Sequence, residues 1–207
     1  MKKKGKIRFL IVENNRPMRN GLETMLIELG FRNYASVIDA EAAWEKIEEE
    51  DIDAVLSSLN LPGMSGLDLL SRIRNSRNYF NLPFVMIAGE DQKTAILNMI
   101  EEEVDYYLIK PVTPRSLEVL LDRIVRTISS PSRYDLAIYA GKYYYINKDL
   151  EKARKSFNIA VQINSEAALP HLYLGNIYYQ LEDLGEAEEA YNKALGTEQD
   201  YVSALTG

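Results

Sequence analysis

Residues 53–66 read DAVLSSLNLPGMSG. A short apolar run leads through two serines to Pro62 and Gly63, which is typical of a buried strand that ends at a turn. Residues 107–113 read YLIKPVT, where Lys110 and Pro111 directly follow another apolar run. In open parallel sheets, ligand sites lie at the carboxyl ends of the strands. The polar residues at these two strand ends are therefore candidate site residues.

The segments around these two stretches alternate between short apolar runs and longer segments with helical spacing of apolar residues. Strands that alternate with helices require crossover connections, and crossovers give a parallel sheet. The order predicts an α/β fold of the flavodoxin-like, doubly wound type, with a five-stranded parallel sheet. The predicted strands are 8–12, 34–37, 54–56, 84–87 and 106–109, and the predicted helices are 17–29, 41–49, 67–74, 92–102 and 114–127.

Residues 7–128 resemble the receiver domain of response regulators, the CheY-like domain of two-component phosphorelay signal transduction. The resemblance is carried by the first strand, the turn at 61–66 and the stretch 107–113. In that family an Asp four residues before the Pro accepts a phosphoryl group, and two acidic residues after the first strand help to hold magnesium. The resemblance places Ser58 at the phosphoacceptor position, Glu13 and Asn14 at the acidic pair, and Lys110 at the lysine that contacts the phosphoryl group.

Further positions of this pocket can be compared with the family pattern. Asn60 keeps only a backbone carbonyl role, Ala88 stands where the family has a switch hydroxyl, and Tyr107 retains the switch aromatic. A single Glu among neutral oxygens is expected to bind magnesium weakly at most, through Glu13, because magnesium prefers several hard oxygen ligands. These residues predict a degenerate phosphorylation pocket, a pseudo-receiver, without a cofactor.

The nucleophile of this pocket is also weak. A serine hydroxyl needs a positioned base or a lowered pKa to attack phosphorus, and the only histidine of the chain, His171, lies in the later helical region. No catalysis is therefore expected, and the protein is predicted not to be an enzyme. Because Lys110 then has no phosphate to contact, we expect it to pair with Glu13 or to hydrogen-bond Ser58.

A 34-residue repeat follows residues 129–132, which read SSPS. GKYYY at 141–145 corresponds to GNIYY at 175–179. This period, with small residues at the crossings of paired helices and aromatic residues beside them, resembles the tetratricopeptide repeat (TPR). The predicted helix pairs are 134–146 with 150–163 and 168–181 with 185–195. The residues predicted to pack at the crossings are Gly141, Tyr144, Ala153, Phe157, Ala160, Gly175, Tyr178, Ala187, Tyr191 and Ala194.

We therefore expect a receiver domain over residues 1–129 and an all-α TPR array over residues 130–207. The array contains two repeats, 134–167 and 168–201. Residues 202–205 stand where a third repeat would begin, or else belong to a capping segment. Because about three repeats are usually needed for stability, three alternatives are open: the sequence is truncated within a third repeat, the last helix of the receiver serves as a cap, or another chain covers the open face.

Composition and charge exclude several classes of protein. The chain has 207 residues, a net charge of −7 and no cysteine, so disulfides and thiolate metal sites are absent and a reducing compartment fits. Neither half carries the basic face that nucleic acid requires, so no nucleic-acid partner is expected. The apolar run at 9–12 is too short for a signal sequence or a membrane span. We expect a cytoplasmic protein with no membrane partner.

These observations favour a signalling adaptor. The receiver is expected to act by protein–protein interaction without phosphorylation, and the TPR repeats to bind a protein partner on their concave face. A receiver–receiver dimer or a sensor-kinase contact is a further expected interaction. Two alternatives remain: a phosphorelay response regulator with atypical phosphorylation and TPR-mediated output, and a pseudo-receiver that senses a small molecule.

Overall fold

The computed structural model describes residues 4–89 and 104–206, which form two compact units. The first unit is Met1–Ser130 and the second is Pro131–Gly207. Within the described residues, no helix combines the length and the apolar character needed to cross a bilayer.

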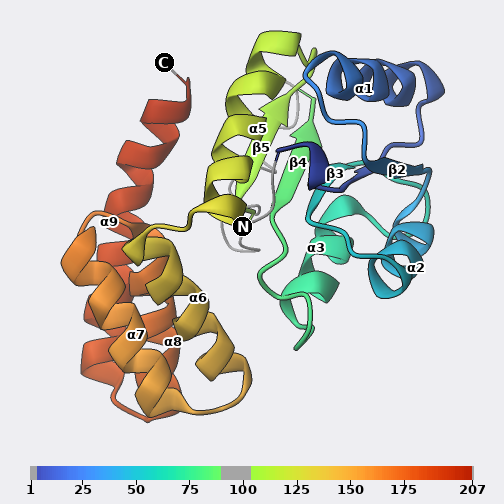
Figure 1. Cartoon of the computed structure of the whole chain (residues 1–207). Helices are drawn as coiled ribbons and strands as arrows, with labels where there is room; N and C mark the ends of the chain where they lie inside the picture. Colours follow the sequence, from blue (N-terminus) through green and yellow to red (C-terminus); the bar gives the residue numbers. More distant parts are fainter. Residues whose placement is uncertain (1–3, 90–103, 207) are drawn as a thin grey trace. The chain divides into compact units, whose positions relative to one another are not determined.

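A parallel sheet forms the centre of the first unit (Figure 1). Its order is β2-β1-β3-β4-β5, which is a flavodoxin-like order and confirms the predicted fold class. β3 is longer than predicted because Ser57 and Ser58 continue the ladder with β4, and backbone pairing does not depend on an apolar side chain. The strands are β1 (Phe9–Val12), β2 (Tyr34–Val37), β3 (Ala54–Ser58), β4 (Phe84–Ala88) and β5 (Tyr106–Ile109).

Helices cover both faces of this sheet (Figure 1). α1 (Arg16–Glu28) and α5 (Pro114–Ser129) contribute to the core on one face, and α2 (Ala40–Glu49) and α3 (Gly66–Arg74) to the core on the other. A short 3-10 turn, Lys4–Lys6, precedes β1. The predicted helix over 92–102 lies outside the described residues. Side-chain caps begin the four helices and so fix where each loop leaves the sheet; they are Asn15, Asp39, Ser65 and Thr113.

The second unit consists of helices packed as two pairs. α6 (Arg133–Ile146) packs with α7 (Leu150–Ile163), and α8 (Ala168–Gln180) packs with α9 (Leu184–Thr206). The turns inside the pairs are equivalent: Lys148 has φ 64° and Glu182, which is 34 residues later, has φ 62°. Two helix pairs with the same turn agree with the predicted TPR architecture.

The end of α9 differs from the prediction. Residues 202–205 continue α9 to Thr206 and do not begin a separate helix. In the first pair, α7 ends at Ile163 with Asn164 as its C-cap. The equivalent position in the second pair is Glu198, and Glu favours a helix interior more than Asn does. The loss of this stop signal accounts for the longer helix.

Candidate functional site

Three predicted site residues meet at the carboxyl edge of the sheet. Glu13 follows β1, Ser58 ends β3 and Lys110 follows β5. β1 and β3 are paired neighbours in the sheet, so the residues at their ends lie side by side. Lys110 is held at the same edge by its backbone N–H, which donates to the carbonyl of Ala88 at 2.8 Å.

Glu13 is buried, and its carboxylate accepts three hydrogen bonds. Oε1 accepts from the backbone N–H of Asn15 at 2.8 Å. Oε2 accepts from the Ser58 hydroxyl and from the Lys110 ammonium, whose Nζ lies 3.0 Å away. A buried carboxylate is costly unless it is paired and hydrogen-bonded, and here both oxygens have partners.

Ser58 connects the two charged residues. Its hydroxyl donates to Glu13, and its oxygen accepts from Lys110 Nζ at 3.0 Å. Ser58 is fully buried, whereas the Lys110 side chain is 36% exposed. Both contacts anticipated for Lys110 are thus present together, and they form a closed triangle of donors and acceptors. The peptide bond between Lys110 and Pro111 is cis.

The turn after β3 leaves no room for a larger residue at Gly66. A Cβ added there would lie 2.3 Å from the backbone oxygen of Ser58. The Gly66 N–H donates to the Leu59 carbonyl at 2.9 Å, which pulls the start of α3 against the end of the strand. The Gly at this position of the turn therefore fixes the strand end that carries Ser58.

The remaining predicted pocket residues lie outside the triangle. Asn14 and Asn60 are exposed to solvent. Ala88 is buried at the end of β4, and Tyr107 is partly buried against the core on the α2 and α3 face. Tyr107 therefore has a packing role in addition to its position in the pocket.

Arg19 also contacts the site and was not predicted from the sequence. Its Nη1 donates to the backbone carbonyl of Glu13 at 2.7 Å and lies 3.5 Å from that of Asn14. Arg19 is the fourth residue of α1, so its guanidinium can reach back to the loop that holds Glu13. The backbone N–H of Asn15 was missed as well, because a backbone donor leaves no signal in the pattern of side chains.

The site does not fit a magnesium ion. Magnesium would need several oxygen ligands that are free to bind it, with charges that balance its own. The carboxylate of Glu13 is already bonded to Lys110, Ser58 and the Asn15 N–H. Across residues 4–89 and 104–206, no three His, Cys, Asp or Glu side chains gather as metal ligands do.

In the helical unit the predicted glycines lie at close helix crossings. A Cβ added to Gly141 would lie 2.6 Å from the ring of Phe157, and one added to Gly175 would lie 2.6 Å from the ring of Tyr191. The two contacts are related by the 34-residue offset. The other predicted packing residues are buried at Ala153, Ala160, Ala187 and Ala194, and partly buried at Tyr144 and Tyr178.

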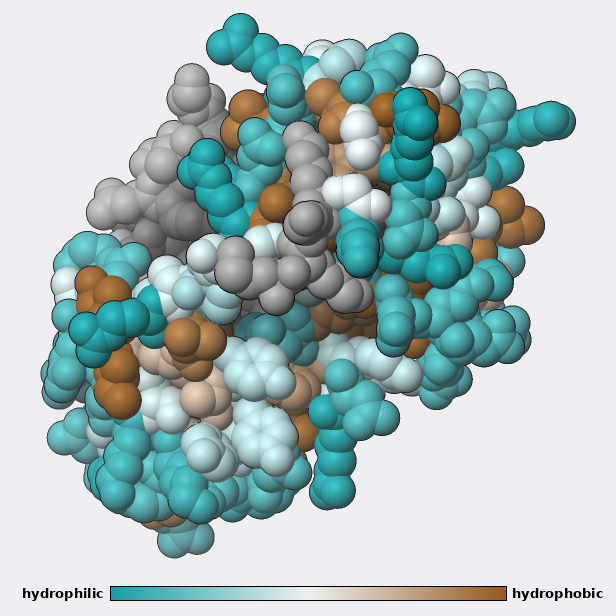
Figure 2. Space-filling view, viewed as in Figure 1, coloured by the Kyte–Doolittle hydropathy of each residue, from teal (hydrophilic) through white to brown (hydrophobic). Residues whose placement is uncertain are grey.

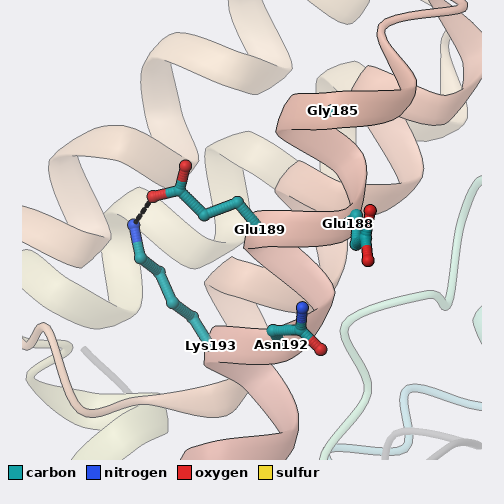
Figure 3. Close-up of a pocket in the computed structure, with 5 residues that line it drawn as sticks. All are labelled: Gly185, Glu188, Glu189, Asn192 and Lys193. Carbon is teal, nitrogen blue, oxygen red and sulfur yellow. Dashed lines mark hydrogen bonds and ion pairs between the residues drawn. The ribbon is translucent and has the colours of Figure 1, made fainter.

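The second unit has a shallow hollow on α9 (Figure 3). Five α9 residues line it, and the Lys193 ammonium pairs with Glu189 Oε1 at 2.7 Å. It was not predicted from the sequence, because its residues read as a solvated helix face. The lining residues are Gly185, Glu188, Glu189, Asn192 and Lys193.

Comparison with protein families gives two matches. Residues 9–122 match the response regulator receiver domain. Residues 168–196 match the tetratricopeptide repeat, which covers the second of the two helix pairs. Both families are those whose motifs the sequence resembles.

Known proteins similar to this chain include chemotaxis proteins. The chain is 34% identical over 118 residues to the chemotaxis protein CheY-3 of Vibrio cholerae, an alignment that covers 57% of this chain and 91% of that protein. It is 28% identical over 122 residues to the chemotaxis protein CheY1 of Helicobacter pylori, which covers 58% and 98% of the two chains.

Solved structures match the first unit. A receiver domain of a sensor histidine kinase from Pseudomonas aeruginosa PAO1, solved with a magnesium ion in its active-site cleft, is 27% identical with a TM-score of 0.53 and covers 57% of this chain and 97% of its own. A response regulator from Chloroflexus aurantiacus is 26% identical with a TM-score of 0.55, covering 57% and 97%.

Proposed function

Because the chain belongs to the response regulator receiver family, we propose that it is a signalling adaptor whose receiver acts without accepting a phosphoryl group. The receiver and the TPR match together make it a response-regulator-like signalling protein. The finer proposal concerns the pocket. It assigns Glu13, Ser58 and Lys110 a structural role, and it assigns no catalytic role to any residue.

This proposal rests on the Glu13 carboxylate, both of whose oxygens already accept hydrogen bonds within the chain. Lys110 contributes the positive charge beside it, at 3.0 Å, and Ser58 bridges the two. In this arrangement the strand end is neutralised from within the chain. A cation bound at Glu13 Oε2 would displace the Lys110 ammonium and the Ser58 hydroxyl, and a phosphoryl group on Ser58 would remove the hydrogen bond from Ser58 to Glu13.

Ser58 is also a poor phosphoacceptor in this geometry. Its hydroxyl is buried, and its proton is directed at Glu13, which is the arrangement expected of a bridging hydrogen bond. The Glu13 carboxylate, at which that proton points, already accepts hydrogen bonds from Lys110 and from the Asn15 N–H. We therefore assign Ser58 to the structural network.

The output of the protein is proposed to be binding of other proteins. TPR arrays present surfaces for peptides and proteins, and the second unit contains two such helix pairs. A receiver–receiver dimer or a contact with a sensor kinase remains a further proposal. Fold alone does not decide function, so the partner surface needs its own evidence.

Incubation with acetyl phosphate and MgCl2, followed by intact-mass measurement, tests the proposal. We expect no mass gain, while a phosphorylatable chemotaxis receiver treated in parallel gains one phosphoryl group. A gain mapped to Ser58 by peptide fragmentation would contradict the proposal and favour a phosphorelay regulator. A small molecule that copurifies and is released on Lys110→Met would favour ligand sensing instead.

A further inference from the structure

The second helix pair exposes apolar side chains at positions that are covered in the first pair. Exposed apolar side chains stand among hydrophilic ones on the visible side of this unit (Figure 2). Three strongly exposed apolar residues of this pair are Tyr179, Leu184 and Leu195, at 63%, 63% and 60%. Their counterparts 34 residues earlier are Tyr145, Leu150 and Val161, all partly buried against the core of the unit.

α8 is the helix that packs against the first pair at this place. The ring of Tyr173 stacks on Phe157 of α7 with centroids 4.5 Å apart, and it meets Tyr145 edge-on at 5.2 Å. Leu174 and Ile177 are buried on the same helix. Since the two pairs are equivalent, α8 shows what kind of segment fits such a face: a helix with aromatic and aliphatic residues along one side.

The hollow on α9 (Figure 3) shares Glu188 with the side of the helix that carries Leu184 and Leu195. Leu184 and Glu188 are four residues apart, and Leu195 is seven residues after Glu188, so the three share one side of the helix. Gly185 leaves open space, because a Cβ added there would meet nothing within 4 Å. A residue of a docked helix can therefore approach the α9 backbone at this point.

The negative charge of the second helix pair indicates which kind of molecule can bind there. Residues 168–201 contain seven acidic residues and a single lysine, Lys193, which is paired with Glu189. Glu188 also lines the hollow. Two copies of this face placed against each other would bring like charges together, which is unfavourable, whereas a helix with basic residues would be attracted.

We propose that the open face, defined as Tyr179, Leu184, Glu188 and Leu195, docks one amphipathic helix of a partner protein. That helix carries an aromatic and aliphatic stripe, as α8 does, with a basic residue that faces Glu188. This inference rests on the proposed role of the repeats as the binding module. It adds a partner site on the second helix pair.

A labelled peptide tests the proposal on the full 207-residue chain. The probe has the sequence of residues 168–181, ALPHLYLGNIYYQL, with two lysines added at each end. Fluorescence anisotropy is expected to show saturable binding. Leu184→Glu with Leu195→Glu should weaken it at least about tenfold, because apolar anchors at the centre of an interface carry most of the binding energy.

Matched controls isolate the face and its charge. Ile159→Glu with Ile163→Glu changes two α7 residues of 47% and 45% exposure and should leave the affinity unchanged. Glu188→Lys should weaken binding of the lysine-flanked peptide and strengthen binding of a glutamate-flanked one. Far-UV circular dichroism of every variant checks that the helices are retained.

Several outcomes would overturn the inference. These are the absence of saturable binding, an equal loss of affinity in the α7 control, and a dimer in sedimentation that Leu184→Glu with Leu195→Glu dissociates, which would assign the face to a second copy. None of them touches the pocket at Ser58. Conversely, a phosphoryl gain at Ser58 would contradict the proposed receiver function and leave peptide binding unchanged, so the two failures can be told apart.

Discussion

Lys110 and Glu13 are 97 residues apart in the chain, yet Lys110 Nζ lies 3.0 Å from Glu13 Oε2. They follow β5 and β1, and two other strands, β3 and β4, separate these strands in the sheet. The contact therefore spans the carboxyl edge of the sheet. Ala88 ends β4 with a minimal side chain, and Ser58 ends β3 with one that joins the contact. Loss of either charged residue should therefore lower the free energy of unfolding of this unit.

Lys110→Met removes the charge and keeps most of the side-chain bulk. Glu13 then stays buried with only neutral donors, so we expect the free energy of unfolding to fall by about 2 kcal/mol, below the full cost of breaking a buried pair because Lys110 is partly exposed. Urea unfolding followed by Trp44, the only tryptophan and a residue of α2, measures this unit.

Two controls accompany the lysine variant. Lys46→Met breaks a partly exposed i,i+4 pair at the end of α2, in the unit that Trp44 reports, and should cost less than about 1 kcal/mol. Adding Glu13→Gln to Lys110→Met removes the unpaired charge and should recover part of the loss. If Lys110→Met and Lys46→Met unfolded at the same urea concentration, the pairing of Lys110 with Glu13 would contribute no more to stability than an exposed pair does.

Asn14→Asp together with Ser58→Asp returns two carboxylates to the pocket beside Glu13. Without metal this variant should be less stable than the natural chain, because one lysine then faces three carboxylates. With MgCl2 at about a hundred times the dissociation constant it should regain about 2–3 kcal/mol. The natural chain should show no change beyond that given by NaCl at equal ionic strength. An equal gain in the natural chain would show that its pocket binds magnesium as it stands.

The sequence predicted the edge of the sheet better than the details of the loops. Lys110, Ser58 and Glu13 could be placed together because parallel strands bring their carboxyl ends to one edge. Arg19 could not be predicted, since its contact depends on the path of the loop between β1 and α1. β3 was predicted too short because two serines interrupt the apolar pattern, although the backbone ladder continues through them.

The helical unit shows the same division between regular and irregular features. The 34-residue period predicted that Gly141 and Gly175 lie at helix crossings, and the structure adds the ring that each one faces, Phe157 and Tyr191. The end of α9 was not predicted, because a repeat pattern assumes that every unit stops at the same position. The exposed face at Leu184 and Leu195 also has no signal in a single repeat. It becomes visible when the burial of equivalent positions is compared.

Gly175→Ala tests the close crossing of α8 and α9. The added Cβ would lie 2.6 Å from the Tyr191 ring, which is packed and cannot move without cost. We expect a loss of about 1–3 kcal/mol, as is usual for overpacking. Gly185→Ala is the matched control, because its Cβ would meet nothing within 4 Å and alanine favours a helix over glycine by up to about 1 kcal/mol. Circular dichroism at 222 nm should show opposite shifts of the urea midpoint. Equal shifts would contradict the close crossing.

Tyr191 should make the stability of the helical unit depend on pH. Burial, with a smaller effect of the nearby Tyr179, raises the pKa of Tyr191 above its ordinary value of 10.0. The folded chain therefore holds this proton at a pH where the unfolded chain loses it. The contribution to stability is complete below pH 10 and is lost as the pH rises through the folded pKa.

Tyr191→Phe isolates this effect from that of the other tyrosines. At pH 8 the variant should be about 1 kcal/mol less stable than the natural chain, because the Tyr191 hydroxyl donates to Asn176 Oδ1 at 2.7 Å. Above the ordinary pKa the natural chain loses the advantage and the difference should shrink. Urea unfolding of both proteins in steps from pH 8 to about pH 11 measures it, since tyrosine titrates near pH 10. A difference that stayed constant across this range would mean that Tyr191 titrates alike in the folded and unfolded chains.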